Sequence, residues 1–153
     1  MSKSGSIELS ITGGLEDVRL LGIRVRAIAR ALVSTEQAAL VELCTVEVAN
    51  NCMEHAYEGA EGGAIDVTLR AGSQELVVEV RDRGRPIGSS GLEAAADPFG
   101  FDPTDIELLP EGGMGLALIR ASVSRYEYAR EGDCNVTRLH FPLDDAGSCE
   151  KAP

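Results

Sequence analysis

Apolar side chains alternate with polar ones near the N-terminus and then recur at helical intervals. The alternation over residues 6–11 predicts a first strand. Apolar residues that return every three or four positions over residues 15–33 predict a helix. The Ser-Thr pair at 34–35 ends this helix and caps a second one, expected from about residue 35 to 57, with Gln37 placed to support the cap. The apolar stripe expected along the second helix consists of Leu40, Leu43, Cys44, Val48 and Cys52.

The second half of the chain adds two strand pairs and a helix around a long irregular segment. The predicted elements are strands near 65–69 and 76–80, a helix at about 114–124, and strands at 125–130 and 135–142. Short turns make each strand pair antiparallel, and the helices then cover one face of the sheet. The pattern predicts an α+β fold, a two-layer sandwich, in one domain over residues 1–143, followed by a loose tail at 144–153.

Charge and composition narrow the function classes. The 153-residue chain has 14 basic and 25 acidic residues and a net charge of −11, which disfavours direct binding to nucleic acid or anionic membranes. No apolar run approaches the ~20 residues of a membrane span, and the first residues lack an apolar signal segment, so we expect a cytoplasmic protein. The four cysteines form no Cys-x-x-Cys pair and are expected to be reduced, with Cys44 and Cys52 as packing residues.

Lysine is confined to the two ends of the chain. Lys3 and Lys151 are the only lysines, and the other twelve cations are arginines. A Walker-type phosphate loop and the eukaryotic kinase fold each require a lysine on the phosphates, and neither lysine lies in such a context. If the protein handles ATP, its phosphates must be held in another way.

The second predicted helix carries a polar stripe. Glu47, Asn51 and His55 are spaced i, i+4 and i+8, so a regular helix places them on one face. This spacing also fits an ordinary solvated stripe. In a functional interpretation, the amide oxygen of Asn51 binds a hard cation such as magnesium and the Glu47 carboxylate one turn earlier acts as a base.

Two further motifs flank the long segment at 83–112, which is rich in Gly, Pro, Ser and Asp. Asp82 ends a strand, where its carboxylate can accept a hydrogen bond from an exocyclic amine, and Gly84 lets the backbone approach a flat ring. An ordinary Asp-x-Gly turn explains the same residues. Glycines 112, 113 and 115 lead directly into the next helix, and free amides at a helix start can bind an anion.

The order of these motifs resembles the GHKL (Bergerat) ATP-binding fold over about residues 6–142. Within that fold, EVANNCMEHAYEG and EGGMGLALI are similar to the RsbW-like anti-sigma factor serine/threonine kinases of bacterial partner-switching systems. The resemblance implies that Asn51 ligates Mg2+, Glu47 is the general base and Asp82 holds the adenine amine beside Gly84. It implies a flexible ATP lid at residues 87–112. The nucleotide-binding candidates are Asn51, His55, Asp82, Gly84, Gly113, Met114, Gly115 and Leu116.

The resemblance also implies an activity and partners. The family uses ATP, releases ADP and phosphorylates a small STAS-type antagonist protein on serine or threonine. A kinase homodimer otherwise sequesters a sigma factor or analogous regulator. This chain differs from the family in its lid, because no cation occurs from Pro86 to Ile119. The alternative is therefore a nucleotide-loaded binding or adaptor module that sequesters a regulator without phosphoryl transfer; a histidine kinase fragment is a more remote interpretation.

Arginines concentrate in the first predicted helix. Arg19, Arg26 and Arg30 are spaced i, i+7 and i+11, and Arg24 lies nearby. A solvated helix face explains them, and so does a docking surface for an acidic partner.

Overall fold

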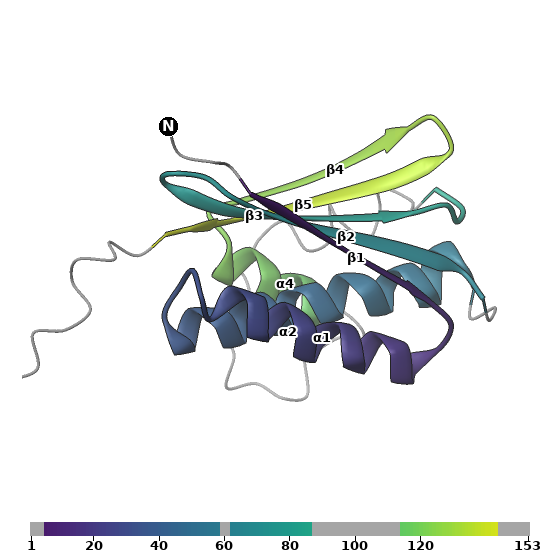
Figure 1. The fold of residues 1–153 in the computed structure, drawn as a ribbon. Helices are drawn as coiled ribbons and strands as arrows, with labels where there is room; N and C mark the ends of the chain where they lie inside the picture. The colour runs from purple at the N-terminus through teal and green to yellow at the C-terminus, as the bar shows by residue number, and fades with distance from the viewer. Residues whose placement is uncertain (1–4, 59–61, 87–113, 144–153) are drawn as a thin grey trace, which may run out of the picture.

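The fold is a five-stranded antiparallel sheet with its helices packed on one face (Figure 1). The computed structural model describes residues 5–58, 62–86 and 114–143. Its elements are β1 (Ser6–Thr12), α1 (Leu15–Ala29), α2 (Thr35–Asn51), the π-helical turn η1 (Cys52–Ala56), β2 (Ala64–Ala71), β3 (Glu75–Asp82), α4 (Met114–Ser122), β4 (Arg125–Glu131) and β5 (Cys134–Pro142). The predicted α+β two-layer sandwich is confirmed. The expected lid at 87–112 and the tail at 144–153 lie outside the described residues.

The strand order of the sheet is β1-β2-β3-β5-β4. The β2–β3 and β4–β5 pairs are the two hairpins expected from the sequence, and β3 and β5 meet at the centre of the sheet. Their register places Asp82 opposite Asn135 and Val80 opposite Thr137. The last residue of the first hairpin therefore lies beside the start of the last strand.

The start of α2 is capped as the sequence predicts. The backbone N–H of Gln37 donates to the side-chain oxygen of Ser34 at 3.2 Å. The side chain of Gln37 does not complete a reciprocal capping box. Its amide donates instead to the carbonyl oxygen of Pro142 at the end of β5. The cap thus fixes the start of α2 and also attaches it to the sheet.

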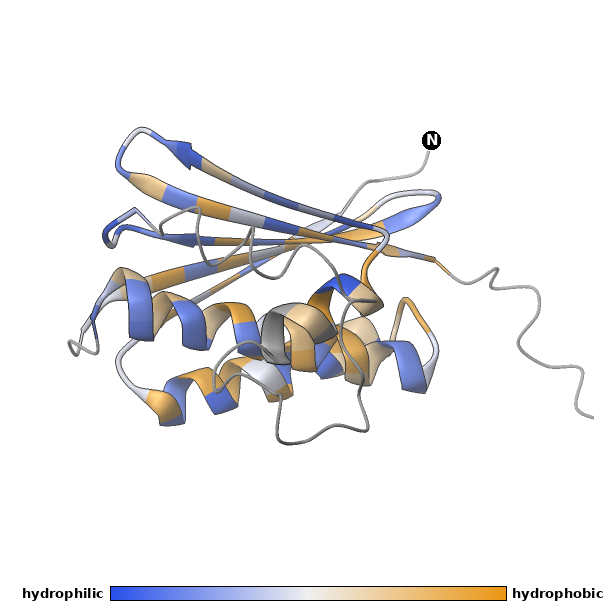
Figure 2. Ribbon diagram, turned by 180° about the vertical axis from the view of Figure 1, so that it is seen from behind, coloured by the Kyte–Doolittle hydropathy of each residue, from blue (hydrophilic) through white to orange (hydrophobic). Residues whose placement is uncertain are grey.

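The core lies between the helices and the sheet. Hydrophobic and hydrophilic residues alternate along the strands (Figure 2), and the buried apolar residues of the strands and of the helices form one core cluster. The prediction for α2 is wrong at two positions, because Leu40 and Leu43 are 37% and 42% exposed. Smaller residues, among them Ala38 and Val41, are buried instead. Cys44, Val48 and Cys52 are buried as expected.

The opposite face of the sheet is covered by its own ion pairs. Glu79 is only 5% exposed and receives hydrogen bonds from Arg81 Nε at 2.7 Å and Arg138 Nε at 2.9 Å. Burial alone would raise the pKa of Glu79, but the hydrogen bonds and charges of these arginines outweigh it and lower the pKa below its usual value. This face therefore carries a charged network, while the apolar core is confined to the helical side.

The arginines of α1 are partly committed to ion pairs. Arg19 lies 3.6 Å from Glu16, and Arg26 lies 3.5 Å from Glu42 of α2. Arg24 is exposed. The docking role of this helix stays a prediction. None of the helices in the described ranges is both long and apolar enough to span a bilayer.

Candidate functional site

The Asp82 carboxylate is buried where β3 ends. Only 2% of the residue is exposed. Its Oδ1 atom accepts two hydrogen bonds, from the backbone N–H of Gly84 at 2.9 Å and from Nδ2 of Asn135 at 2.8 Å. Both groups donate to the same oxygen, so the carboxylate serves as a hydrogen-bond acceptor here. This arrangement suits the acceptor role predicted for Asp82.

The end of the α2 helix lies against this carboxylate. The Cys52 thiol follows Asn51 directly, and its hydrogen bond to Asp82 brings the η1 turn to the end of β3. Burial, together with the negative charge of Asp82, raises the pKa of the Cys52 thiol. The two predicted motifs, on α2 and at the end of β3, are therefore neighbours in space.

Gly84 lies so close to η1 that no side chain fits there. A Cβ atom on Gly84 would lie 2.5 Å from the carbonyl carbon and oxygen of Ala56. The next residue, Arg85, donates its backbone N–H to the same Ala56 oxygen at 2.8 Å. The close approach that the sequence suggested is thus made to the helix end; proximity of Gly84 to an adenine ring stays a prediction.

Substituting Gly84→Ala is expected to lower the free energy of unfolding by about 1–3 kcal/mol, because β3 and η1 must move apart. The matched control is Gly72→Ala, since a Cβ there meets nothing closer than the Glu75 oxygen at 3.4 Å. Urea denaturation of both variants measures the difference. Equal stability of the two variants would show that the contact between Gly84 and Ala56 is not tight in solution.

Glu47 and Asn51 lie one turn apart on α2, and both are half-buried. Cys44, one turn before Glu47, hydrogen-bonds Ser122 at the end of α4, and burial raises the pKa of the Cys44 thiol to about 11. The carboxylate of Glu47 adds to this rise in pKa through its charge. The polar stripe therefore runs from the side of α2 near α4 toward the end of β3.

His55 does not continue the regular stripe. It lies in the π-helical η1 turn, where each residue rotates the chain less than in an α-helix, so the i, i+4 spacing fails after Asn51. The His55 side chain is 56% exposed and lies 3.9 Å from Glu54. Its role in nucleotide binding stays a prediction.

The glycine-rich candidates are described only in part. Gly113 lies outside the described residues, and the backbone of Met114, Gly115 and Leu116 forms the first turn of α4, as predicted. The buried side chain of Ile119 anchors this helix in the core. A helix start of this kind presents free backbone N–H groups.

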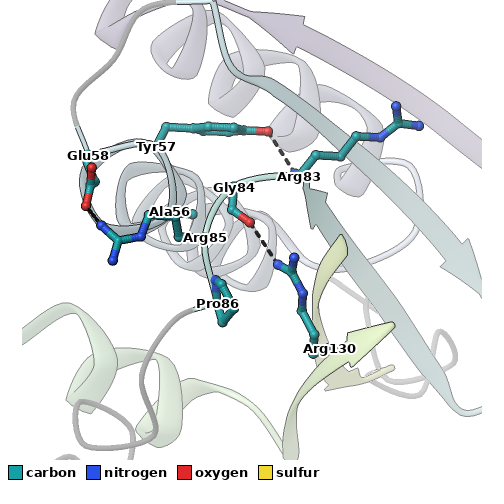
Figure 3. A pocket seen from close by; sticks show the side chains of 8 residues that line it. All are labelled: Ala56, Tyr57, Glu58, Arg83, Gly84, Arg85, Pro86 and Arg130. Atoms are coloured by element: carbon teal, nitrogen blue, oxygen red, sulfur yellow. Dashed lines mark hydrogen bonds and ion pairs between the residues drawn. The ribbon is translucent and has the colours of Figure 1, made fainter. Parts of the chain in front are cut away.

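An open cavity of about 510 Å³ lies between the end of η1, the segment that follows β3, and β4 (Figure 3). Arg130 reaches across from β4 and donates to the Gly84 carbonyl oxygen at 2.8 Å. Tyr57 accepts a hydrogen bond from the backbone N–H of Arg83 at 2.8 Å and donates to Ala64 at 2.6 Å. The residues lining the cavity are Ala56, Tyr57, Glu58, Arg83, Gly84, Arg85, Pro86 and Arg130.

Sequence reasoning missed the residues that come from the last hairpin. Asn135 of β5 donates a hydrogen bond to Asp82, and Arg130 of β4 donates one to Gly84. The predicted strands at 125–130 and 135–142 do form this hairpin, but its position beside β3 depends on the strand order, which local periodicity does not give.

Residues 11–141 match the family described as the histidine kinase-like ATPase domain, which is most of the described fold and contains the whole candidate site. The chain belongs to this family. The matched range includes the end of α2, the end of β3 and the start of α4.

Curated relatives of this ATPase domain include serine-protein kinases. The serine-protein kinase RsbW of Halalkalibacterium halodurans is 27% identical over 138 residues, covering 89% of this chain and 83% of the relative. The protein of the same name from Staphylococcus epidermidis is 22% identical over 137 residues, covering 88% and 86%. These relatives therefore match the ATPase domain over nearly its full length.

Solved histidine kinases share the fold of the ATPase domain. The blue-light activated histidine kinase of Erythrobacter litoralis EL346 aligns with a TM-score of 0.53 at 22% identity, covering 75% of this chain. The chain spans only 33% of that kinase. A second structure, of its histidine kinase domain, gives a TM-score of 0.51 at 19% identity.

Proposed function

We propose that this chain is an ATP- and Mg2+-dependent protein serine/threonine kinase that phosphorylates a STAS-type antagonist and otherwise sequesters a sigma factor or analogous regulator as a homodimer. The match to the histidine kinase-like ATPase domain across the site is the observation that carries the nucleotide half of the proposal. The full-length similarity to proteins named serine-protein kinase RsbW supports the protein-kinase half.

The buried Asp82 carboxylate supports an adenine pocket. Its oxygen Oδ1 takes the two donors described above, so we assign the exocyclic amine of adenine to Oδ2, whose two acceptor sites also leave room for the Cys52 thiol. Thr137 lies on the same face of the sheet, opposite Val80, and is 4% exposed. The free amides at the start of α4 are the groups proposed to hold the phosphates, in place of a lysine.

The donor set fits magnesium held jointly with phosphates. Among the described residues no group of three or more His, Cys, Asp or Glu side chains is placed to hold a metal ion. Asn51 offers one amide oxygen, a ligand type that Mg2+ accepts while it keeps waters and binds phosphate oxygens. When bound, Mg2+ supplies positive charge to the phosphates.

Glu47 is proposed as the base of the transfer step. The hydroxyl of the partner's serine or threonine attacks the γ-phosphorus, the bond to the β,γ-bridging oxygen breaks, and ADP leaves. The carboxylate of Glu47 orients the hydroxyl and accepts its proton. The α4 amides stabilise the charge on the transferred phosphoryl group.

The decisive assay mixes the wild-type protein with its genome-neighbouring STAS-type antagonist, ATP and Mg2+. Intact mass spectrometry is expected to show one phosphoryl group on the antagonist, and none when Mg2+ is chelated. The alternative, a nucleotide-loaded binding module, is favoured by the absence of any cation between Pro86 and Ile119. It predicts nucleotide binding and complex formation without a phosphorylated product.

A further inference from the structure

The side-chain amide of Asn135 uses all of its hydrogen-bonding groups, and it does so beside the Asp82 carboxylate. Its Nδ2 donates to Asp82 Oδ1 and to the Arg85 carbonyl oxygen, both at 2.8 Å. Its Oδ1 accepts from the Tyr128 hydroxyl at 2.6 Å and from Arg130 Nη1 at 3.1 Å. An amide offers two donors and two acceptor sites, so the orientation of Asn135 is fully determined.

We propose that Asn135 is a positioning residue that fixes the Asp82 carboxylate as an acceptor and thereby makes the site selective for 6-aminopurine over 6-oxopurine nucleotides. This inference rests on the proposed nucleotide site. It adds Asn135 as a second residue of β5, beside Thr137, to a site otherwise built from α2, β3 and α4. Asn135 is 1% exposed, so it acts through Asp82.

The hydrogen bond from Asn135 determines which oxygen of Asp82 is available. Together with the Gly84 N–H, it occupies Oδ1 and holds the carboxylate plane. Oδ2, which takes neither of these two donors, is the oxygen proposed to accept from the ligand. An exocyclic amine at purine position 6 donates a hydrogen bond to such an oxygen. A carbonyl oxygen at the same position is itself an acceptor, so it forms no hydrogen bond with the carboxylate and repels it.

The β4–β5 hairpin holds the adjoining backbone in the same way. Arg130 donates to the Gly84 carbonyl oxygen as well as to Asn135, and Asn135 donates to the Arg85 carbonyl oxygen. The hairpin therefore fixes both the carboxylate and the backbone segment that follows it. By holding this backbone segment, the hairpin restricts the position of the purine as well as its hydrogen bonds.

Asn135→Asp is the sharpest test, because it keeps the side-chain shape and replaces the donor with an oxygen. When both acids are ionised, two carboxylates oppose each other across a 2.8 Å contact and Asp82 is displaced. When the pair shares a proton, the hydrogen bond to Asp82 re-forms. Relative to wild type, ATP affinity is therefore expected to fall at least about tenfold near pH 8 and to recover toward about pH 5.5.

The comparison with wild type at each pH isolates this pair. The groups that face Asp82 and Asn135 are the Cys52 thiol, the phenols of Tyr57 and Tyr128, and the guanidinium of Arg130. Burial raises the pKa of Cys52 and of Tyr57, and arginine stays charged, so these do not produce the expected recovery at low pH. Titration of the nucleotide phosphates is common to both proteins and cancels in the ratio.

The measurement is Mg-ATP and Mg-GTP affinity by isothermal titration calorimetry for wild type, Asn135→Asp and Gln74→Glu. Gln74→Glu makes the same amide-to-acid change at an exposed position in the β2–β3 turn. Wild type and this control are expected to prefer ATP at every pH. Asn135→Asp is expected to lose most of that preference near pH 8, by about tenfold.

Arg130→Gln covers the case in which Asn135→Asp does not fold. Arg130 is exposed, so the substitution leaves the core intact and removes its bonds to Asn135 and Gly84. We expect about a threefold loss of ATP preference. If Asn135→Asp folds and its preference for ATP over GTP is unchanged, the inference is overturned. If Asn135→Asp does not fold, an unchanged preference in Arg130→Gln overturns it. A wild type that binds ATP and GTP equally, or neither, contradicts the nucleotide site itself.

Discussion

Replacing Glu47 with alanine is expected to lower phosphoryl transfer to the antagonist by about 10²–10⁴-fold, the usual contribution of a positioned general base. Nucleotide affinity is expected to stay within about threefold of wild type, because the base acts on the partner's hydroxyl. Single-turnover transfer from radiolabelled ATP measures the first quantity, and calorimetry measures the second.

The matched control for this substitution is Glu36→Ala, which removes an exposed carboxylate from the first turn of the same helix. It is expected to transfer phosphate at the wild-type rate. If Glu47→Ala transfers as fast as the control, the base is another group. If Glu47→Ala loses nucleotide binding as well, Glu47 belongs to the nucleotide pocket.

Asp82→Asn is expected to weaken ATP and ADP binding by about 100-fold, which corresponds to about 2.7 kcal/mol. The amide either turns a donor toward the adenine amine or turns it toward Asn135, whose Nδ2 already donates to this position at 2.8 Å. Both orientations set donor against donor. Calorimetric titration with Mg-ADP measures the loss without any turnover.

Asp66→Asn is the control for charge alone. Asp66 is an exposed residue of β2 that accepts a hydrogen bond from Ser10 at 2.6 Å, and its loss removes one negative charge from the same sheet. We expect this variant to bind Mg-ADP like wild type. Equal affinities for Asp82→Asn and Asp66→Asn would exclude Asp82 from the nucleotide site.

Local patterns in the sequence predicted the elements well, because strand alternation, helical spacing and the Ser34 cap depend on neighbouring residues. They failed where tertiary packing decides. Leu40 and Leu43 are exposed because the buried face of α2 is set by its packing in the core, and smaller residues occupy that face. The π-helical turn that moves His55 off the stripe has no periodic signal of its own.

In the candidate site, too, local sequence patterns revealed some residues, while others depend on tertiary structure. Asp82 was visible as a carboxylate that interrupts an apolar strand, and Asn51 as an amide on an apolar helix. Asn135 was not visible, since its importance arises only when β5 pairs with β3 and places it opposite Asp82. A residue that acts across a strand pairing can be found from sequence only when the strand order and register are known.

A crystal structure of the protein grown with Mg-ADP tests the central claim most directly. We predict a purine between the end of α2 and the end of β3, with its 6-amino group on Asp82, the metal on the Asn51 amide oxygen and the phosphates at the start of α4. A purine bound elsewhere on the molecule, or no purine at saturating Mg-ADP, would contradict it.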